Sequence, residues 1–306
     1  MVSAADLSAA VGAVRLANPV MPASGTFGFG AEAARLYDIT KLGGVVMKGV
    51  TTLPRLGNPL PRVTDCPAGM LNAVGLENPG IDNALKNELP ALASMYNGPI
   101  IANVCGFTVD EYAALAARFD ESDAVAALEI NISCPNVSHG GMAFGTDCRA
   151  AADVTRAVRR SSRKPVWIKL SPNVTDIAQI ARACEAEGAD ALCLINTLLG
   201  MRIDLRTRRP ILGNTFGGLS GPCALPVAIR MVWQVYEAVT IPIVGMGGIA
   251  SARDVMEMAL AGASAVEIGT AGLVDPTALI DIIDELPGVI SSMGYNSYAA
   301  LVGAAH

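Results

Sequence analysis

Short apolar segments alternate with longer helical patterns along the whole chain, and this alternation constrains the fold more than any other feature. Eight such segments are rich in aliphatic residues and lack polar alternation, as expected of parallel strands covered on both faces. They comprise residues 19–23, 44–48, 99–104, 126–132, 165–170, 191–196, 241–245 and 265–269. Eight strand–helix units without a break in composition predict an α/β fold, a (β/α)8 TIM barrel, over its rival, a doubly wound sheet.

Helix start signals lie between the predicted strands. Thr108 and Glu111, like Ser251 and Asp254, have the spacing of a capping box, in which two side chains satisfy free N–H groups at a helix start. Asp275 followed by proline predicts a cap residue before a first-turn proline. These signals place helices where a barrel requires them.

Two stretches exceed what a minimal barrel needs. Residues 49–80 are rich in Pro, Gly and Asn, and residues 197–221 repeat that pattern with several arginines. Each follows a predicted strand, so both are expected as long insertions at the C-terminal face, where barrel active sites form. We expect one domain, residues 1–306, with no second domain.

Composition excludes several classes of protein. The chain has 306 residues, 52% hydrophobic and 16% charged, with a net charge of −6, which disfavours disorder and a nucleic-acid surface. Its seven cysteines form no C-x-x-C pair and it has two histidines, so we expect no metal site built by this chain alone. Reduced thiols predict a cytoplasmic protein. No signal peptide or membrane-spanning stretch is expected.

Residues 131–136, Asn-Ile-Ser-Cys-Pro-Asn, directly follow a predicted buried strand. A structural turn is the alternative, because Pro-Asn is common in turns. Two amides and one ionisable sulfur at a strand end also suit the rim of an active site, with donors and acceptors for a flat polar ligand and a group that can move a proton.

Glycine clusters follow the seventh and eighth predicted strands, at residues 245–249 and 268–272, and a third cluster lies at 217–221. Glycine there lets backbone N–H groups approach a phosphate, and the dipole of the following helix favours its charge. Glycine also relieves crowding at such turns, but two clusters in these two units predict a phosphate site.

Lysines and asparagines gather at the predicted strand ends. Lys48 and Lys169 each end an apolar strand, where a lysine must meet an anion or reach solvent. Asn103, Asn131 and Asn196 occupy equivalent positions. A ring of amides and ammonium groups around one mouth would suit a flavin, whose ring offers carbonyls and nitrogens and whose tail carries a phosphate.

Four motifs together resemble the class 1 dihydroorotate dehydrogenases. They are residues 46–50 (VMKGV), 72–79 (NAVGLENP), 131–136 (NISCPN) and 245–249 (GMGGI). The resemblance runs from about Leu16 to the C-terminus. Residues 137–141 (VSHGG) are more similar to the B-type catalytic subunit than to the A-type. The membrane segment and the serine base of class 2 enzymes are both missing.

The resemblance implies an FMN-binding barrel that oxidises (S)-dihydroorotate to orotate in pyrimidine (UMP) biosynthesis. It implies FMN contacts from Ser24, Lys48, Gly49, Asn103, Asn131, Lys169, Ile195, Gly221, Gly247, Gly248, Gly269 and Thr270. It implies substrate contacts from Lys48, Asn72, Ala73, Val74, Gly75, Leu76, Asn131, Asn196 and Thr197. Cys105 is a departure, since the family more often has a small residue such as Ala or Gly there.

Cys134 matches the catalytic base of the family. Forming the double bond requires a proton to leave C5 and a hydride to leave C6, and the flavin accepts the hydride. A base is needed on the opposite face, so we expect Cys134 on a mobile loop that closes over the substrate. Lys48 is the second catalytic candidate, with its charge at the flavin–substrate interface. His139 is expected to shape the loop rather than to catalyse.

The B-type resemblance also implies partners. This chain has no second nucleotide fingerprint and no cysteine cluster, so electrons are expected to pass to NAD through a separate subunit with FAD and a [2Fe-2S] cluster, in a heterotetramer built on a homodimer core.

Three other functions stay open at this point. One is another FMN barrel reductase acting on dihydropyrimidines, similar to dihydropyrimidine dehydrogenase. A second is a non-redox phosphate-binding barrel, such as a sugar-phosphate aldolase or isomerase. The third is an inactive scaffold, which a thiol beside two amides and two strand-end lysines disfavours.

Overall fold

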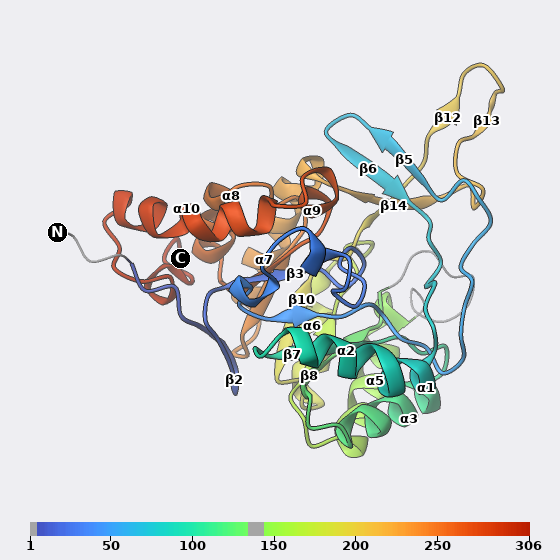
Figure 1. The fold of residues 1–306 in the computed structure, drawn as a ribbon, viewed down its shortest axis with the longest axis horizontal. Helices are drawn as coiled ribbons and strands as arrows, with labels where there is room; N and C mark the ends of the chain where they lie inside the picture. Colours follow the sequence, from blue (N-terminus) through green and yellow to red (C-terminus); the bar gives the residue numbers. More distant parts are fainter. Residues whose placement is uncertain (1–4, 134–143) are drawn as a thin grey trace.

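Eight parallel strands form the centre of the structure (Figure 1), a computed structural model that describes residues 5–133 and 144–306. Their order in the sheet is β3-β16-β15-β10-β9-β8-β7-β4. Their bounds are β3 Val20–Pro22, β4 Val45–Val46, β7 Ile100–Val104, β8 Val125–Asn131, β9 Val166–Lys169, β10 Ala191–Leu194, β15 Ile243–Met246 and β16 Ala263–Ile268. Each corresponds to one predicted strand, and the (β/α)8 fold is confirmed.

The first and last strands of this order, β3 and β4, close the barrel without a regular ladder. The N–H of Gly43 donates to the carbonyl of Val20 at 3.0 Å. A Cβ on Gly43 would lie 1.9 Å from the carbonyl oxygen of Asn18, so only glycine permits this close approach. The connection between the two strands uses short 3₁₀ helices, η1 (Ala33–Arg35) and η2 (Ile39–Lys41).

Helices cover the outside of the barrel (Figure 1). They are α1 Ile81–Asn83, the π-helical η3 Ala84–Glu88, α2 Leu89–Met95, α3 Val109–Asp120, α5 Cys148–Ser161, α6 Ile177–Ala186, α7 Leu225–Tyr236, α8 Ala252–Leu260, α9 Thr270–Val274 and α10 Ala278–Ser292. Among the described residues, none of these helices has the length and apolarity needed to cross a membrane.

The helix caps agree with the sequence in two of three cases. Thr108 accepts the N–H of Glu111 at the start of α3, and Ser251 accepts that of Asp254 at the start of α8. The prediction for Asp275 was wrong: it ends α9, and α10 begins after Thr277. Its carboxylate instead accepts the N–H and the hydroxyl of Thr277, both at 3.0 Å, so it shapes the turn between the two helices.

The two long insertions meet above the barrel, as Figure 1 shows. The first contributes β5 (Val63–Cys66) and β6 (Gly69–Asn72), and the second contributes β11 (Leu198–Gly200) and β14 (Gly217–Ser220). They form one antiparallel sheet in the order β11-β14-β6-β5. A projecting hairpin, β12 (Ile203–Asp204) with β13 (Arg209–Pro210), extends the second insertion. The position of both insertions at the C-terminal face is as predicted.

Short elements complete the described chain. They are the hairpin β1 (Ala9–Val11) with β2 (Val14–Leu16), η4 (Pro222–Ala224) before α7, and η5 (Ala299–Leu301) near the C-terminus.

Asp120, the last residue of α3, binds the turn between α5 and β9 at the N-terminal face of the barrel. Its carboxylate accepts the hydroxyl of Ser162 at 2.8 Å and the N–H groups of Arg163 and Lys164 at 2.7 and 3.2 Å. Burial raises the pKa of Asp120, but these hydrogen bonds outweigh it and lower that pKa to about 2. The ionised carboxylate therefore stabilises the fold.

We expect Asp120→Ala to lower the free energy of unfolding at pH 7 by about 2 kcal/mol, which is the pKa shift expressed as energy. Because the folded pKa is depressed, this contribution is present above the ordinary Asp pKa and is lost as pH falls toward 2. Urea unfolding at several pH values would measure it. Asp123→Ala is the control, because Asp123 is exposed and lies between α3 and β8. Equal losses of unfolding free energy in both variants would contradict the assignment.

Candidate active site

A cavity of about 250 Å³ opens at the C-terminal ends of the barrel strands, beneath the insertion sheet. Predicted site residues that line it are Ser24, Lys48, Gly49, Asn72, Val74, Gly75, Leu76, Asn103, Asn131, Lys169, Ile195, Asn196, Thr197, Gly221, Gly247, Gly248, Gly269 and Thr270. Residues from both insertions and from the ends of all eight barrel strands thus converge on one space, as parallel strand direction requires.

Two predicted residues are not among them. Ala73 does not line the cavity: it is fully buried and packs with Leu71 and Leu212 in a small separate core under the insertion sheet. Cys134 lies outside the described residues, as does His139, so the loop expected to carry them has no structural description. Asn131, three residues before Cys134, is on the cavity wall.

A buried cluster of charges forms the floor of the cavity. The Lys169 ammonium lies 3.2 Å from Glu129 Oε1 on β8, 3.2 Å from Glu267 Oε2 on β16 and 3.4 Å from Ser24 Oγ. Burial lowers the pKa of Lys169, but the two carboxylates outweigh it and raise that pKa above the ordinary value. Lys169 is therefore a fixed positive charge rather than a lysine that reaches solvent.

Amide side chains along one wall are held in place by each other. The Asn131 side-chain oxygen accepts the backbone N–H of Ser133 at 3.2 Å and the amide of Asn196 at 3.4 Å. Asn196 also donates to Ser133 Oγ at 2.8 Å and accepts the N–H of Thr197 at 2.7 Å. Fixed amides present donors and acceptors at set angles, which suits a planar polar ligand.

Cys105 supports another amide, Asn103. Its thiol donates to the Asn103 side-chain oxygen at 3.2 Å, and the Asn103 amide donates to Glu129. A Cβ on Gly49 would lie 2.6 Å from that Asn103 oxygen and 2.8 Å from the Cys105 sulfur. The departure noted in the sequence is therefore accommodated by packing against Gly49, and it orients Asn103.

The opposite wall presents the turns that precede helices α7 and α9. Helices α7 and α9 have no side-chain cap, and their preceding turns carry Gly221 and Gly269. Gly247 and Gly248 adopt φ of +117° and +85°, and Gly248 packs so closely on α7 that a Cβ would lie 2.4 Å from Leu225 N. Uncapped N–H groups beside close backbone turns suit a phosphate.

The first insertion supplies the remaining wall, which is fixed from outside by Asn78. The Asn78 side-chain oxygen accepts the N–H groups of Thr51 and Gly80, at 3.1 and 2.8 Å, and its amide donates to Thr51 Oγ1 at 2.8 Å. Gly75 has φ +80°, and a Cβ on it would lie 2.5 Å from the Asn58 side chain. These contacts hold the loop of residues 72–79 in one conformation.

Sequence reasoning missed Glu129 and Glu267, although a signal was present. Each is an acid within an apolar strand, and a buried charge requires a partner. Ser220, which accepts the Thr270 hydroxyl at 2.8 Å, and Asn173, which donates to the Thr197 carbonyl at 3.1 Å, were also missed. Both act on cavity residues across long sequence separations.

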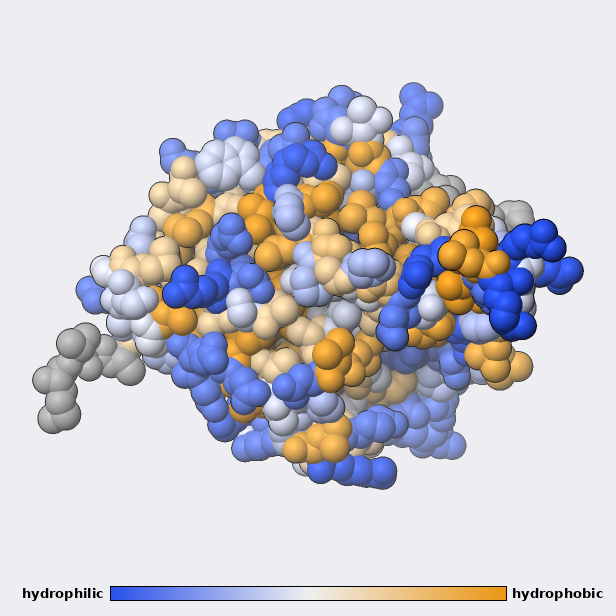
Figure 2. Space-filling view, turned by 90° about the horizontal axis from the view of Figure 1, so that it is seen from above, coloured by the Kyte–Doolittle hydropathy of each residue, from blue (hydrophilic) through white to orange (hydrophobic). Residues whose placement is uncertain are grey.

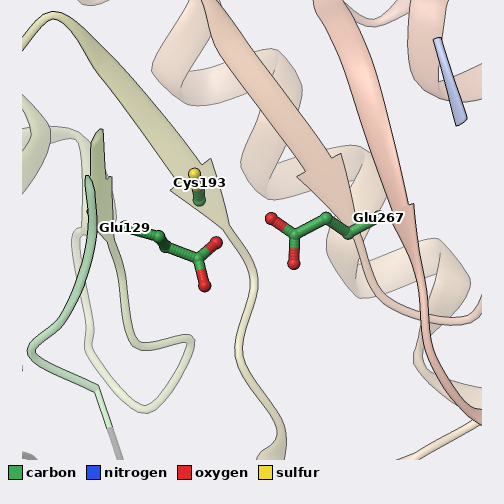
Figure 3. Close-up of side chains that lie close together, drawn as sticks. All are labelled: Glu129, Cys193 and Glu267. Carbon is green, nitrogen blue, oxygen red and sulfur yellow. The ribbon is translucent and has the colours of Figure 1, made fainter. Parts of the chain in front are cut away.

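Glu129, Cys193 and Glu267 also have the composition of a metal site, with ligand atoms within 4.8 Å of one another. Figure 3 shows the two carboxyl groups facing each other inside the barrel, with the thiol of Cys193 between their strands. The Lys169 ammonium already stands 3.2 Å from both carboxylates. The Lys169 ammonium therefore supplies the positive charge that a metal ion would supply between these acids.

The comparisons with known proteins agree with this geometry. The sequence matches the Dihydroorotate dehydrogenase family over residues 6–290. It is 54% identical over 301 residues to a protein of Desulforamulus reducens, covering 98% of this chain and 99% of that protein. It is 55% identical over 288 residues to one of Bacillus pumilus (94% and 93%) and 53% identical over 298 residues to one of Trichlorobacter lovleyi (97% and 98%).

Each of these relatives is named dihydroorotate dehydrogenase B (NAD(+)), catalytic subunit. The match spans nearly the full length of both chains and includes the barrel, both insertions and the cavity that they enclose. The chain belongs to the dihydroorotate dehydrogenase family.

Proposed function

We propose that this chain, acting over residues 1–306 as one catalytic domain, oxidises (S)-dihydroorotate to orotate in pyrimidine biosynthesis, with NAD as the final electron acceptor. The printed names of its relatives support this activity. The observation that carries the proposal is the cavity itself, where fixed amides, two lysines and the glycine turns before α7 and α9 surround one space. Its six described cysteines are free thiols, which supports a cytoplasmic setting.

The residues of the cavity fit FMN. A Cβ on Gly25 would meet no atom within 4 Å, so this backbone borders open space, and one on Gly269 would make only ordinary contacts with Ala23 and Thr26, from 3.5 Å. With Gly221, Gly247, Gly248 and Thr270, the backbones of Gly25 and Gly269 would hold the phosphate. Ser24, Lys48, Gly49, Asn103, Asn131, Lys169 and Ile195 would hold the ring. When bound, FMN supplies the hydride acceptor that no side chain can provide.

The protein groups around the ring bind and orient the substrate. Asn131 and Asn196, held as described, and Asn72, whose amide donates to the Gly218 carbonyl at 3.4 Å, would donate to and accept from its carboxylate and ring amides. Val74, Gly75, Leu76 and Thr197 lie next to them. Lys48 offers a positive charge to the same ligand. Lys169 would stabilise negative charge that develops on the ring. We assign Ala73 a supporting role, because its side chain packs beneath this wall.

Cys134 is the proposed base that removes the C5 proton. We expect Cys134→Ser to lower turnover near neutral pH by on the order of 100-fold or more, because a serine hydroxyl is a far weaker acid than a thiol and loses general-base catalysis. FMN should stay bound. Anaerobic mixing with dihydroorotate, followed by loss of the yellow flavin absorbance, measures the effect.

The same assay contains its controls. Dihydrouracil in place of dihydroorotate separates this activity from that of a dihydropyrimidine reductase. Cys66→Ser, at a thiol that does not line the cavity, should bleach at the wild-type rate. Unchanged bleaching in Cys134→Ser would remove Cys134 from the role of base, and no bleaching of the wild type would refute the proposed activity.

Gly248→Ala tests the phosphate wall. Its Cβ would collide with the backbone nitrogen of Leu225, so α7 must shift together with the preceding turn, whose Gly221 lines the proposed phosphate site. We expect FMN affinity to fall by roughly tenfold or more, about 1.4 kcal/mol, measured as the FMN content of the purified protein after dialysis.

Gly294→Ala is the matched control for that variant. Gly294 has nearly the same backbone conformation, φ +83°, but a Cβ there meets no atom within 4 Å. It therefore introduces the same local strain without the collision. Equal loss of FMN from both variants would show that strain, and not the cavity wall, is responsible.

We further propose a homodimer core that binds an electron-transfer subunit with FAD and a [2Fe-2S] cluster. Figure 2 shows hydrophobic residues lying among hydrophilic ones on the surface of the molecule. Two sets of exposed apolar residues are candidates for these contacts. The groove patch, Leu36, Leu273 and Val274, borders a groove that shares Thr26 and Leu273 with the cavity. The hairpin patch, Leu56, Leu60, Ile203 and Leu205, lies on the insertions.

The groove patch is assigned to the electron-transfer subunit, because it adjoins the cavity and electron transfer requires short distances. The hairpin patch is assigned to the second copy of the chain. Large exposed apolar surfaces usually mark such contacts.

Charged substitutions separate the two assignments. Val274→Glu, at a residue 81% exposed, should weaken NAD reduction in the assembled complex and leave dye reduction by this chain alone unchanged. Leu205→Glu, at a residue 89% exposed, should dissociate the dimer in light scattering. The reverse pattern, or no effect of either change, would overturn the assignments.

A further inference from the structure

The floor of the cavity contains more acid than base. Glu129 and Glu267 are at most 1% exposed and share one ammonium, that of Lys169. Glu129 Oε2 and Glu267 Oε1 have no hydrogen-bond partner among the described residues. If both acids were ionised, the barrel interior would hold one uncompensated charge and two unsatisfied carboxylate oxygens, each of which is strongly destabilising.

A single proton between the two carboxyl groups removes both problems. Figure 3 shows the carboxyl groups pointing toward each other from β8 and β16, and ligand oxygens of the two lie within 4.8 Å. A protonated acid can donate to a neighbouring carboxylate, whereas two carboxylates can only accept. One proton thus supplies a donor and balances the charge of Lys169 with one negative charge.

The hydrogen bonds identify which acid carries the proton. Glu129 accepts from both Asn103 and Lys169, which favours its ionised form. Glu267 accepts from Lys169, and no amide of the described residues donates to it. Burial raises the pKa of Glu129, but Lys169 and the hydrogen bonds lower it overall; for Glu267, burial and then the charge of Glu129 raise the pKa well above its usual range.

We propose that Glu267 is a positioning residue that stays protonated in the folded protein at neutral pH, donates a hydrogen bond to Glu129, and thereby fixes the Lys169 ammonium at the cavity floor. The other side chains that face it are compatible with this state. Burial, and then the two acids, raise the pKa of the Cys193 thiol on β10, so it is neutral. Ser24 after β3 is uncharged, and Lys48 lines the cavity above.

This protonation has a consequence for whatever binds in the cavity. With one carboxylate and one ammonium, the floor is neutral overall and Lys169 can attract negative charge on a ligand ring. Loss of the proton would place a second negative charge beneath that ring. The consequence for FMN rests on the proposed function, whereas the protonation itself can be tested without any activity.

Three variants of the purified protein test the protonation by urea unfolding. At acidic pH, near the ordinary Glu pKa, Glu267→Gln keeps a hydrogen-bond donor and the neutral charge, so we expect stability close to wild type there. Glu267→Leu has no donor and should be clearly less stable. Glu129→Gln removes the ionised partner and should also lose stability, so the asymmetry between the two glutamine variants identifies the protonated acid.

The pH dependence gives a readout that a merely structural role would not change. The folded pKa of Glu267 is raised, so the contribution of Glu267 to stability is fully present below the ordinary Glu pKa and is lost as pH rises toward the folded pKa. Its unfolding equilibrium constant should rise by up to about tenfold per pH unit relative to Glu267→Gln in that range. Parallel pH profiles for wild type and Glu267→Gln would overturn the proposal.

Infrared spectroscopy provides an independent test. The wild type at pH 7 should show the carbonyl stretch of one buried carboxylic acid, shifted by deuterium exchange, and Glu267→Gln should lack it. A wild-type spectrum without this band, or a metal ion retained stoichiometrically after dialysis, would refute the shared proton. Either result would leave the proposed dehydrogenase activity unaffected, because bleaching by dihydroorotate is measured separately.

Discussion

Parallel strand direction is the constraint on which the rest of this structure depends. Eight strands hydrogen-bonded in parallel must all end at the same rim, so residues far apart in the sequence meet there without any local signal that joins them. Lys48, Asn103, Asn131, Lys169 and Asn196 are separated by tens of residues, yet all of them line one cavity. The chemistry of the site follows from where strands end.

Inside that rim the barrel contains buried charged side chains, although protein cores are usually apolar. Lys169 on β9 is held between acids from β8 and β16. An apolar residue would fill the space with less desolvation. The barrel interior therefore holds an ammonium in a fixed position beneath the cavity, and its counter-charge comes from the barrel strands rather than from the ligand.

Sequence predicted the elements whose signals are local. The strands, the caps at Thr108 and Ser251 and the glycine turns at 247–248 each depend on a few adjacent residues. The antiparallel sheet of the insertions was not predicted, because β6 and β14 pair across nearly 150 residues and contain glycine, which is rare in strand interiors. Glu129 and Glu267 were missed because their partners are distant in sequence. Ala73 was predicted as a substrate contact, and only packing shows that its side chain lies with Leu71 and Leu212.

The pairing of β6 with β14 has a consequence for how this cavity can vary. Gly218 lies opposite Asn72, and a Cβ there would lie 2.0 Å from Thr197 Oγ1. One wall of the cavity is therefore formed jointly by the two insertions, which are far apart in the sequence. Neither insertion can change its length or sequence, or be transferred to another barrel, without the other. A change of ligand preference on this side of the cavity therefore requires both insertions to change together.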